Sequence, residues 1–229
     1  MSIPAIIHQT WKEERIPPLY ELYVDSWRKL HPGWNYCLWT DADNRRFIEE
    51  QFPAFLECYD AYRWPIQRAD AVRYFLLYHC GGVYVDLDIE CLRPIDSLLS
   101  SASCVIAAES LVHAWIHDRD QILSNALVAS TPGHPFLKAV IDRLPEFARR
   151  IHPNQPVLAT TGPYMLTEVY KDYSAKETVN VLPAAYCSPL TMQQADELRR
   201  TGQKPPGLEQ AYAIHYHVGS WWRTDPVRQ

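Results

Sequence analysis

The first ninety residues alternate between short apolar runs and stretches with helical periodicity. Residues 5–11 form an apolar run that predicts a buried first strand. Apolar side chains then recur at helical spacing over 19–30, and Pro32-Gly33 ends that helix because proline disfavours the helical conformation before it. The aromatic stretch 34–40 is typical of a second strand.

The same alternation continues toward residue 90. Residues 41–43 suit a helix N-cap, and a helix is expected over 44–52. The stretch 68–79 predicts a largely buried helix because apolar side chains occupy most of its faces. Gly81-Gly82 stops it, and 83–89 is expected to form one strand. This order of strands and helices predicts an α/β fold with a mostly parallel central sheet.

The second half of the chain alternates less regularly. Strands are expected over 121–130, 179–182 and 212–218, and helices over 135–144 and 161–173. The proline-dense stretches 153–163 and 183–206 are expected to be ordered loops over a cleft. We therefore expect a single domain, 1–229, with a nucleotide-sugar-binding half to residue 108 and an acceptor-side half over 109–229.

Composition narrows the class of protein. The chain has 229 residues, 47% of them apolar, and a net charge of −5, which suits a folded domain and disfavours a general nucleic-acid binder. The six cysteines form no CxxC pair, so we expect reduced thiols. With no signal peptide or membrane-length apolar run, a soluble, cytoplasmic protein is expected. Trp221-Trp222 suits a buried or substrate-covering pair, with peripheral membrane contact as the alternative.

The strongest chemical signal lies at 83–90, VYVDLDIE. In an extended strand alternate side chains share a face, which places Asp86, Asp88 and Glu90 together opposite an aliphatic face. Like charges this close repel unless a cation lies among them, and carboxylates suit Mg²⁺ or Mn²⁺. A solvated acidic edge strand is the simpler alternative.

A second chemistry fits the same string. In haloacid-dehalogenase-like phosphatases an apolar strand delivers a DxDx(T/V) loop whose first Asp is the nucleophile. Here Glu90 occupies the Thr or Val position, and the strand lies far from the start of the chain. The phosphatase is therefore kept only as an alternative.

Two further features carry polar chemistry. Asp70 and Arg73 lie at i, i+3 on a helix whose surroundings are too apolar for a solvated face, so a buried, functional pair is expected. Such a pair suits hydroxyl and phosphate recognition.

Near the C-terminus, alternation places His215 and His217 on one strand face. A histidine from the second half could complete a metal site with Asp88.

Seven segments follow one another in a set order: 6–11 (IIHQTW), 31–34 with 39–41 (HPGW, WTD), 68–74 (RADAVRY), 81–88 (GGVYVDLD), 125–126 with 132–136 (NA, PGHPF), 161–163 (TGP) and 215–221 (HYHVGSW). Together they cover nearly the whole chain and resemble glycosyltransferase family 32. That family includes the Och1-like α-mannosyltransferases and bacterial capsular-polysaccharide glycosyltransferases. The resemblance implies a GT-A fold that binds a nucleotide sugar at the carboxyl edge of its sheet.

The resemblance also implies roles for the donor-side residues. Trp11 would stack on the nucleotide base with His8 near it, and Asp70 and Arg73 would hold the hydroxyls of the donor sugar. Asp86 would contact ribose, sugar or metal, and Asp88 would be the principal metal ligand.

The resemblance assigns the later motifs as well. The family often has two adjacent histidines, and here Tyr216 replaces the second. His215 is therefore the favoured metal ligand and His217 the alternative. Ser220 and Trp221 would cover the diphosphate or its metal, and Asn125 would lie near the anomeric carbon.

The expected reaction is transfer of a hexose of the mannose, galactose or glucose type from a GDP- or UDP-linked donor to a hydroxyl of a glycan or lipid-linked glycan. The family resemblance implies Mn²⁺ or Mg²⁺ and retention of configuration. No residue stands out as a nucleophile, so front-face attack is the expected mechanism. A non-catalytic sugar- or nucleotide-binding module and a host-directed glycosylating effector are the alternatives.

Overall fold

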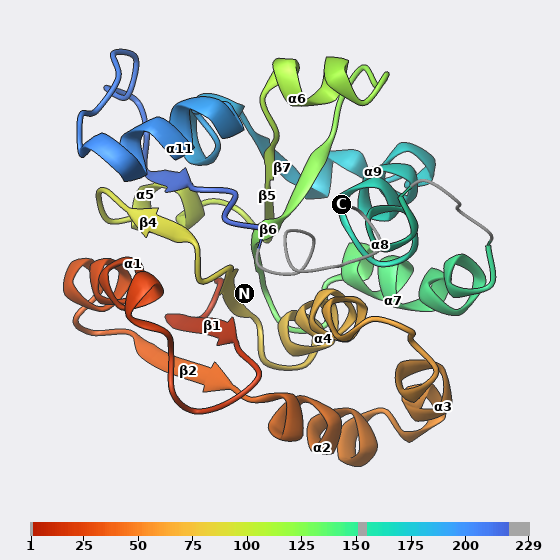
Figure 1. The fold of residues 1–229 in the computed structure, drawn as a ribbon. Coiled ribbons are helices and arrows are strands. Elements are labelled where there is room, and N and C mark those ends of the chain that lie inside the picture. The colour runs from red at the N-terminus through yellow and green to blue at the C-terminus, as the bar shows by residue number, and fades with distance from the viewer. Residues whose placement is uncertain (1, 151–154, 220–229) are drawn as a thin grey trace.

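The central sheet of the protein has six strands in the order β2-β1-β3-β6-β5-β7 (Figure 1). In the computed structural model, residues 2–150 and 155–219 are described. The strands are β1 (Ile6–Thr10), β2 (Asn35–Trp39), β3 (Gly82–Val85), β5 (Cys104–Ala108), β6 (Leu123–Ser130) and β7 (Asn180–Leu182). β6 is antiparallel to both of its neighbours, and the other three pairings are parallel. The predicted α/β fold with a mostly parallel sheet is confirmed.

Helices account for most of the remaining described chain. They are α1 (Pro18–Leu30), α2 (Asp41–Gln51), α3 (Leu56–Asp60), α4 (Pro65–Cys80), α5 (Asp96–Leu99), α6 (Leu111–Ile116), α7 (Pro135–Ala148), α8 (Pro156–Thr160), α9 (Pro163–Asp172), α10 (Ala184–Cys187) and α11 (Met192–Thr201). Short 3-10 turns occupy Pro53–Phe55 and Lys176–Thr178. None of these helices has the length and apolar character needed to span a bilayer.

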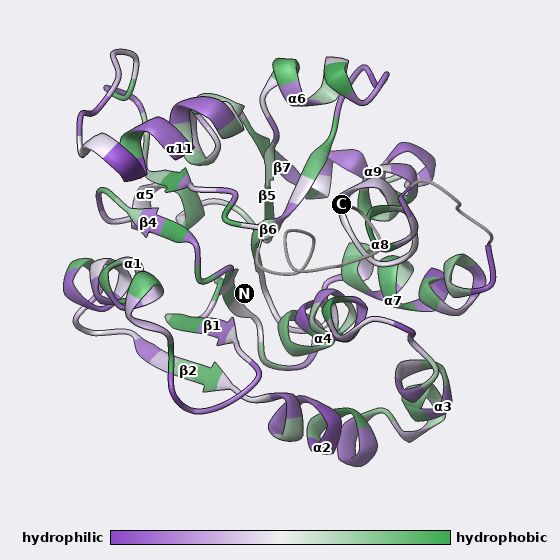
Figure 2. Cartoon of the chain, viewed as in Figure 1, coloured by the Kyte–Doolittle hydropathy of each residue, from purple (hydrophilic) through white to green (hydrophobic). Residues whose placement is uncertain are grey.

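The two faces of the sheet are covered by separate apolar layers. Tyr84 of β3 packs with residues of α4, α7 and α9, whereas its neighbours Val83 and Val85 pack with Trp27 of α1. This is the alternation that a strand buried on both faces requires. Figure 2 shows that the covering helices carry both hydrophobic and hydrophilic residues.

Local signals set the ends of the elements around β3. Thr40, not residues 41–43, is the N-cap of α2, and its side chain accepts from the amide of Asp43 in a capping box. Gly81 is the C-cap of α4, and its φ of 67° falls in the left-handed region. A Cβ there would lie 2.6 Å from Pro132 Cδ, so glycine is required by space as well as by conformation.

The expected single strand over 83–89 is wrong. β3 ends at Val85, a tight turn closed by the amide of Ile89 donating to the oxygen of Asp86 follows, and β4 (Ile89–Cys91) then joins β8 (Ala213–His215) in a second, two-stranded sheet. The alternation of carboxylates therefore marks a turn between two sheets. Glu90 therefore does not lie with the two aspartates, and its carboxylate accepts a hydrogen bond from the Tyr216 hydroxyl.

The second half contains more regular structure than the sequence predicted. α8 lies within 153–163, and α10 and α11 lie within 183–206, so those proline-dense stretches are not continuous loops. β5 was not predicted, and the expected strand over 212–218 is reduced to β8. Because β5 pairs with both β6 and β7, the sheet continues across residue 108. The six cysteines are all free, and three of them, Cys91, Cys104 and Cys187, are buried.

Candidate active site at the carboxyl edge of the sheet

The ends of several strands meet at one edge of the central sheet. β1 and β3 are parallel neighbours, and β5 runs the same way as β3 because both are antiparallel to β6. Asp86 follows β3, Glu109 follows β5, and Asn125 lies near the start of β6. In open α/β sheets ligands bind outside the carboxyl ends of the strands. This edge is therefore the candidate active site.

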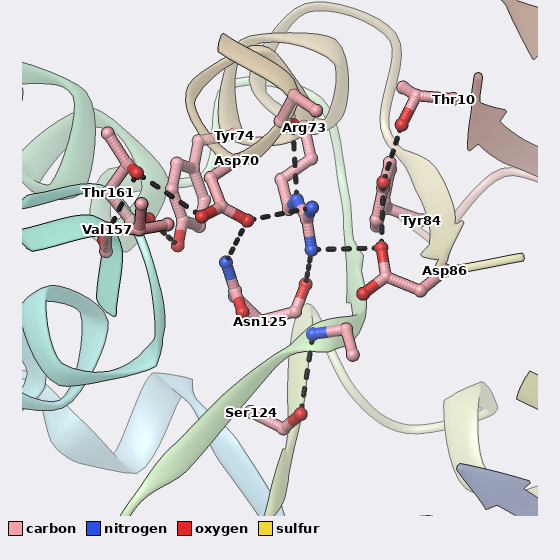
Figure 3. A network of polar contacts seen from close by, with 12 residues as sticks. Thr10, Asp70, Arg73, Tyr74, Tyr84, Asp86, Ser124, Asn125, Val157 and Thr161 are labelled. Atoms are coloured by element: carbon pink, nitrogen blue, oxygen red, sulfur yellow. Dashed lines mark hydrogen bonds and ion pairs between the residues drawn. The ribbon is translucent and has the colours of Figure 1, made fainter. Parts of the chain in front are cut away.

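Asp70 and Arg73 of α4 form the buried ion pair that their spacing predicted (Figure 3). Arg73 Nη2 lies 2.9 Å from Asp70 Oδ1, and the two side chains are 2% and 8% exposed. Asn125 Nδ2 donates to Asp70 Oδ1 at 2.9 Å, and the Thr161 hydroxyl donates to Oδ2 at 3.2 Å. Both oxygens of Asp70 thus have partners supplied by α4, β6 and the residue that follows α8.

Arg73 connects this pair to the end of β3. Its Nη1 donates to the backbone oxygen of Asn125 at 2.6 Å and lies 3.2 Å from Asp86 Oδ1. Its guanidinium carbon lies 4.3 Å from the centre of the Tyr84 ring. Burial acts to lower the pKa of Arg73, but the negative charges of Asp86 and Asp70 outweigh it and raise that pKa. The positively charged guanidinium of Arg73 is therefore held in contact with the Asp86 carboxylate.

Asp86 is oriented by hydroxyl groups as well as by Arg73. The Tyr84 hydroxyl donates to Asp86 Oδ1 at 2.9 Å and lies 2.9 Å from the Thr10 hydroxyl at the end of β1 (Figure 3). Because Tyr84 is the donor to the carboxylate, Thr10 is placed to donate to Tyr84. Burial and the charge of Asp88 raise the pKa of Asp86, whereas Arg73 opposes them. Sequence reasoning did not assign Tyr84 or Thr10 a role.

Asp88 lies beside the second sheet and faces His215. Pairing of Ile89 with His215 brings the C-terminal segment to the turn, and His215 Nε2 lies 3.4 Å from Asp88 Oδ1. The amide of Val218 donates to Asp88 Oδ2 at 2.8 Å. Burial disfavours the Asp88 anion, but His215 and the Val218 amide outweigh it and lower the pKa of Asp88 to about 2.

Asp86, Asp88 and His215 form a set of potential metal ligands. One ligand atom from each lies within 4.8 Å of the others, and His215 Nδ1 is buried without a hydrogen-bond partner. Two carboxylates and an imidazole fit a divalent cation, and an orphaned buried nitrogen in the ring is consistent with a missing partner. Of the two histidines left open by the sequence, His215 joins the aspartates. His217 groups instead with Glu109 and His113.

The remaining predicted residues divide into three groups. His8 is 1% exposed, with its Nε2 bonded to the oxygen of Gly81 and its Nδ1 accepting from Trp39, so it lies in the core and away from the edge. Trp11 follows β1 at the edge, and its ring packs against Tyr20. Ser220 and Trp221 lie outside the described residues.

A first prediction concerns the buried carboxyl of Asp70. Burial raises the pKa of Asp70 from 3.8 to about 6. At a pH between these two values, the Asp70 carboxyl is protonated in the folded chain but ionised in the unfolded chain. The free energy of unfolding therefore decreases as pH rises through this window. At about 1.4 kcal/mol per pH unit, the fall is about 3 kcal/mol.

Denaturant titrations from pH 4 to 7 measure this effect. The stability of the wild type relative to Asp70→Asn is expected to decrease as pH rises. A difference between the two proteins that stays constant over the window contradicts the raised pKa.

Comparison with known proteins identifies the family to which the chain belongs. The model of the "Glycosyltransferase sugar-binding region containing DXD motif" matches residues 17–105. Inositol phosphoceramide mannosyltransferase 1 of Schizosaccharomyces pombe is 40% identical over 189 residues, which cover 80% of this chain and 56% of that protein. Mannosyl phosphorylinositol ceramide synthase SUR1 of Saccharomyces cerevisiae is 37% identical over 190 residues, 80% of this chain and 47% of that protein. The chain thus spans about half the length of these relatives.

Solved structures show the same fold at low sequence identity. The PaToxG glycosyltransferase superposes with a TM-score of 0.55 at 19% identity over 75% of this chain and 70% of that one. The UDP-bound glycosyltransferase domain of the YGT toxin superposes with a TM-score of 0.58 at 11% identity, covering 82% and 80%. With the family match and the yeast relatives, these likenesses confirm the GT-A-like fold and displace the phosphatase alternative. The chain belongs to the glycosyltransferases with a DXD-containing sugar-binding region, the family 32 type that its motifs resemble.

Proposed function

We propose that this chain transfers a hexose, of which mannose is the first candidate, from a nucleotide diphosphate sugar to a hydroxyl of a lipid-linked acceptor, with a divalent metal ion and retention of configuration. The observation that carries the proposal is the meeting of Asp86, Asp88 and His215 at the carboxyl edge of the sheet. The mannose preference is supported by the names of the yeast relatives.

The three ligands suit a specific chemical task. Asp86, Asp88 and His215 would hold Mn²⁺ or Mg²⁺, which supplies positive charge to the departing diphosphate. Arg73 fixes Asp86 from behind, and Val218 and His215 fix Asp88, so the carboxylates are held before substrate arrives. Preorganised charge of this kind is the largest contribution to many transfer reactions.

The route to retention follows from what the edge offers. Asp70 has both oxygens engaged by Arg73, Asn125 and Thr161, and a neutral Asn125 amide is a poor nucleophile. We therefore propose front-face attack within a short-lived ion pair, with Asn125 positioning the sugar. Trapping of a covalent glycosyl-enzyme contradicts this route.

A second prediction tests the donor site. Thermal unfolding is measured with GDP, UDP, CDP and their sugars, each with and without Mn²⁺. A ligand at 100 times its dissociation constant adds about 2.7 kcal/mol of stability. A shift that one nucleotide family produces only with metal is the expected result, and it identifies the donor base. The absence of any shift contradicts the donor site, and binding without turnover over a donor panel favours the non-catalytic module.

The acceptor side carries an exposed apolar surface on α6. Leu111, Trp115 and Ile116 are 77%, 83% and 68% exposed, on a helix at the periphery of the molecule (Figures 1 and 2). His113 of the same helix points inward and contacts Glu109 and His217, so α6 borders the site. Exposed apolar clusters of this kind mark lipid or protein contacts. A lipid acceptor fits this surface, and the name of the Schizosaccharomyces pombe relative contains one, inositol phosphoceramide.

A third prediction tests this acceptor assignment. Replacing Leu111, Trp115 and Ile116 by serine is expected to lower transfer to an inositol phospholipid in vesicles at least about tenfold, since each buried side chain contributes about 1.5–3 kcal/mol to membrane contact. Transfer to a soluble inositol phosphate stays unchanged. Leu22→Ser on α1, where Leu22 is 71% exposed, is the matched control. An equal loss of transfer to both acceptors contradicts a lipid-facing role for α6. Transfer to a protein acceptor instead favours the effector alternative. The cytoplasmic location stays a prediction.

A further inference from the structure

A second group of potential metal ligands lies beside the first. Glu109 directly follows β5 and His113 lies four residues later on α6, whereas His217 follows β8, so two segments that are distant in sequence meet here. One ligand atom from each lies within 4.8 Å of the others. The side chains of Glu109 and His113 are 10% and 12% exposed. The cluster is therefore shielded from bulk water.

His217 is the least satisfied member of the cluster. Its Nε2 is buried and has no hydrogen-bond partner, although its ring centre lies 4.7 Å from that of His113. Its φ of 47° places the backbone in the left-handed region, which a non-glycine residue adopts at a cost. A buried polar atom without a partner is also unfavourable. Both costs are explained if the ring is aimed at a ligand.

The donor set differs from that of the first group. Asp86, Asp88 and His215 offer two carboxylates and one imidazole, which suit Mg²⁺ or Mn²⁺. Glu109, His113 and His217 offer one carboxylate and two imidazoles, the ligand types found in zinc sites with an open fourth position. We propose that Glu109, His113 and His217 form a second metal site that takes Zn²⁺ or a similar borderline divalent ion.

The surroundings of the cluster allow this binding. The Ser188 hydroxyl donates to Glu109 Oε2 at 2.8 Å and orients the carboxylate, the role that outer partners have at metal sites.

One existing contact must be exchanged when the ion binds. His113 Nδ1 lies 3.3 Å from Glu109 Oε2, and His113 Nε2 accepts from the amide of Met192 at 3.3 Å. Coordination through Nδ1 moves the ring proton to Nε2 and displaces that amide. Met192 is the first residue of α11, where an amide has no partner within the helix, and it is 40% exposed, so water can replace the contact.

The proposed site has a structural consequence for the first one. The rings of His215 and His217 lie 3.8 Å apart, so an ion on His217 fixes the segment that presents His215 to Asp88. The ion would also tie α6 to the end of β5 and to the chain after β8. This inference does not depend on which sugar or acceptor the protein uses.

Metal titrations of the full chain test the proposal. The wild type is loaded with Zn²⁺ in the presence of excess Mg²⁺, dialysed, and assayed for bound zinc by atomic emission. One zinc ion per chain is expected to remain. His217→Gln is expected to weaken zinc affinity at least about 100-fold, because loss of an outer partner alone costs 10–100-fold. Asp88→Asn, which alters the first group only, is expected to keep the zinc.

Two further measurements keep the test decisive. The Co²⁺-loaded protein is expected to lack the near-ultraviolet band of thiolate ligation, which separates this site from the six free cysteines. Glu109→Gln repeats the test if His217→Gln does not fold. Any of three results overturns the proposal: the wild type retains no zinc, a thiolate band appears, or zinc is lost from Asp88→Asn but kept in His217→Gln.

Discussion

Replacement of Arg73 by methionine is expected to lower the free energy of unfolding by about 3–5 kcal/mol, the cost of removing one partner from a buried ion pair. Arg73 is 2% exposed and contacts both Asp70 and Asp86, so its loss leaves the buried Asp70 carboxylate and the partly buried Asp86 carboxylate without their cation. Sugar transfer is expected to fall with it, because Asp86 loses the group that fixes it. Denaturant titration measures the first effect, and transfer at a temperature where the variant is folded measures the second.

The chain offers a matched control for this variant. Arg45 also contacts two carboxylates, Asp60 at 2.8 Å and Glu49 at 3.2 Å, but its side chain is 47% exposed. Surface ion pairs of this kind contribute little to stability. Arg45→Met is therefore expected to unfold close to the wild-type midpoint. Similar losses of stability in the two variants contradict the view that burial gives Arg73 its importance.

The Arg73 network illustrates what the sequence could predict. The i, i+3 spacing of Asp70 and Arg73 and the apolar residues around them are local signals, and both the helix and the burial were predicted correctly. Asn125 and Thr161 came from motifs of the family resemblance. Their hydrogen bonds to Asp70 span 55 and 91 residues of sequence, a pairing that no local pattern contains.

The turn after β3 shows why an alternating pattern misled. Hydrophobic and polar residues alternate from Val83 to Glu90, and a strand is the natural prediction for such a pattern. The chain instead turns at Leu87, whose side chain packs into a different apolar cluster from Val83 and Val85. Period-2 patterning identifies which side chains are buried. It does not identify which sheet receives them.

The Glu109 cluster was missed for a related reason. β5 was not predicted, and so the residue that follows it could not be placed at the carboxyl edge. His113 lies on a helix of six residues with an exposed apolar face, the reverse of the usual amphipathic pattern. Only the pairing of β5 with β6 and of β4 with β8 brings these side chains near His217.

Asp88→Asn is expected to lower the rate of sugar transfer by at least about 10²–10³-fold, the usual cost of losing one charge-stabilising contact in a transition state. Asparagine keeps the shape of the side chain and can still accept from the Val218 amide, so the fold is expected to persist. The variant removes a negative charge from the set Asp86, Asp88 and His215, and Mn²⁺ affinity is expected to fall with activity. Transfer rates and Mn²⁺ titrations on the same preparation measure both effects.

Glu90→Gln is the control that separates charge at the metal site from charge near it. Glu90 lies two residues along the chain but accepts from the Tyr216 hydroxyl at 2.7 Å, and a glutamine oxygen can accept the same bond. Its transfer rate and Mn²⁺ response are expected to match the wild type. Near-wild-type turnover of Asp88→Asn at saturating Mn²⁺ contradicts the metal assignment. A loss in both variants instead indicates that the two-stranded sheet, which presents His215, carries the effect.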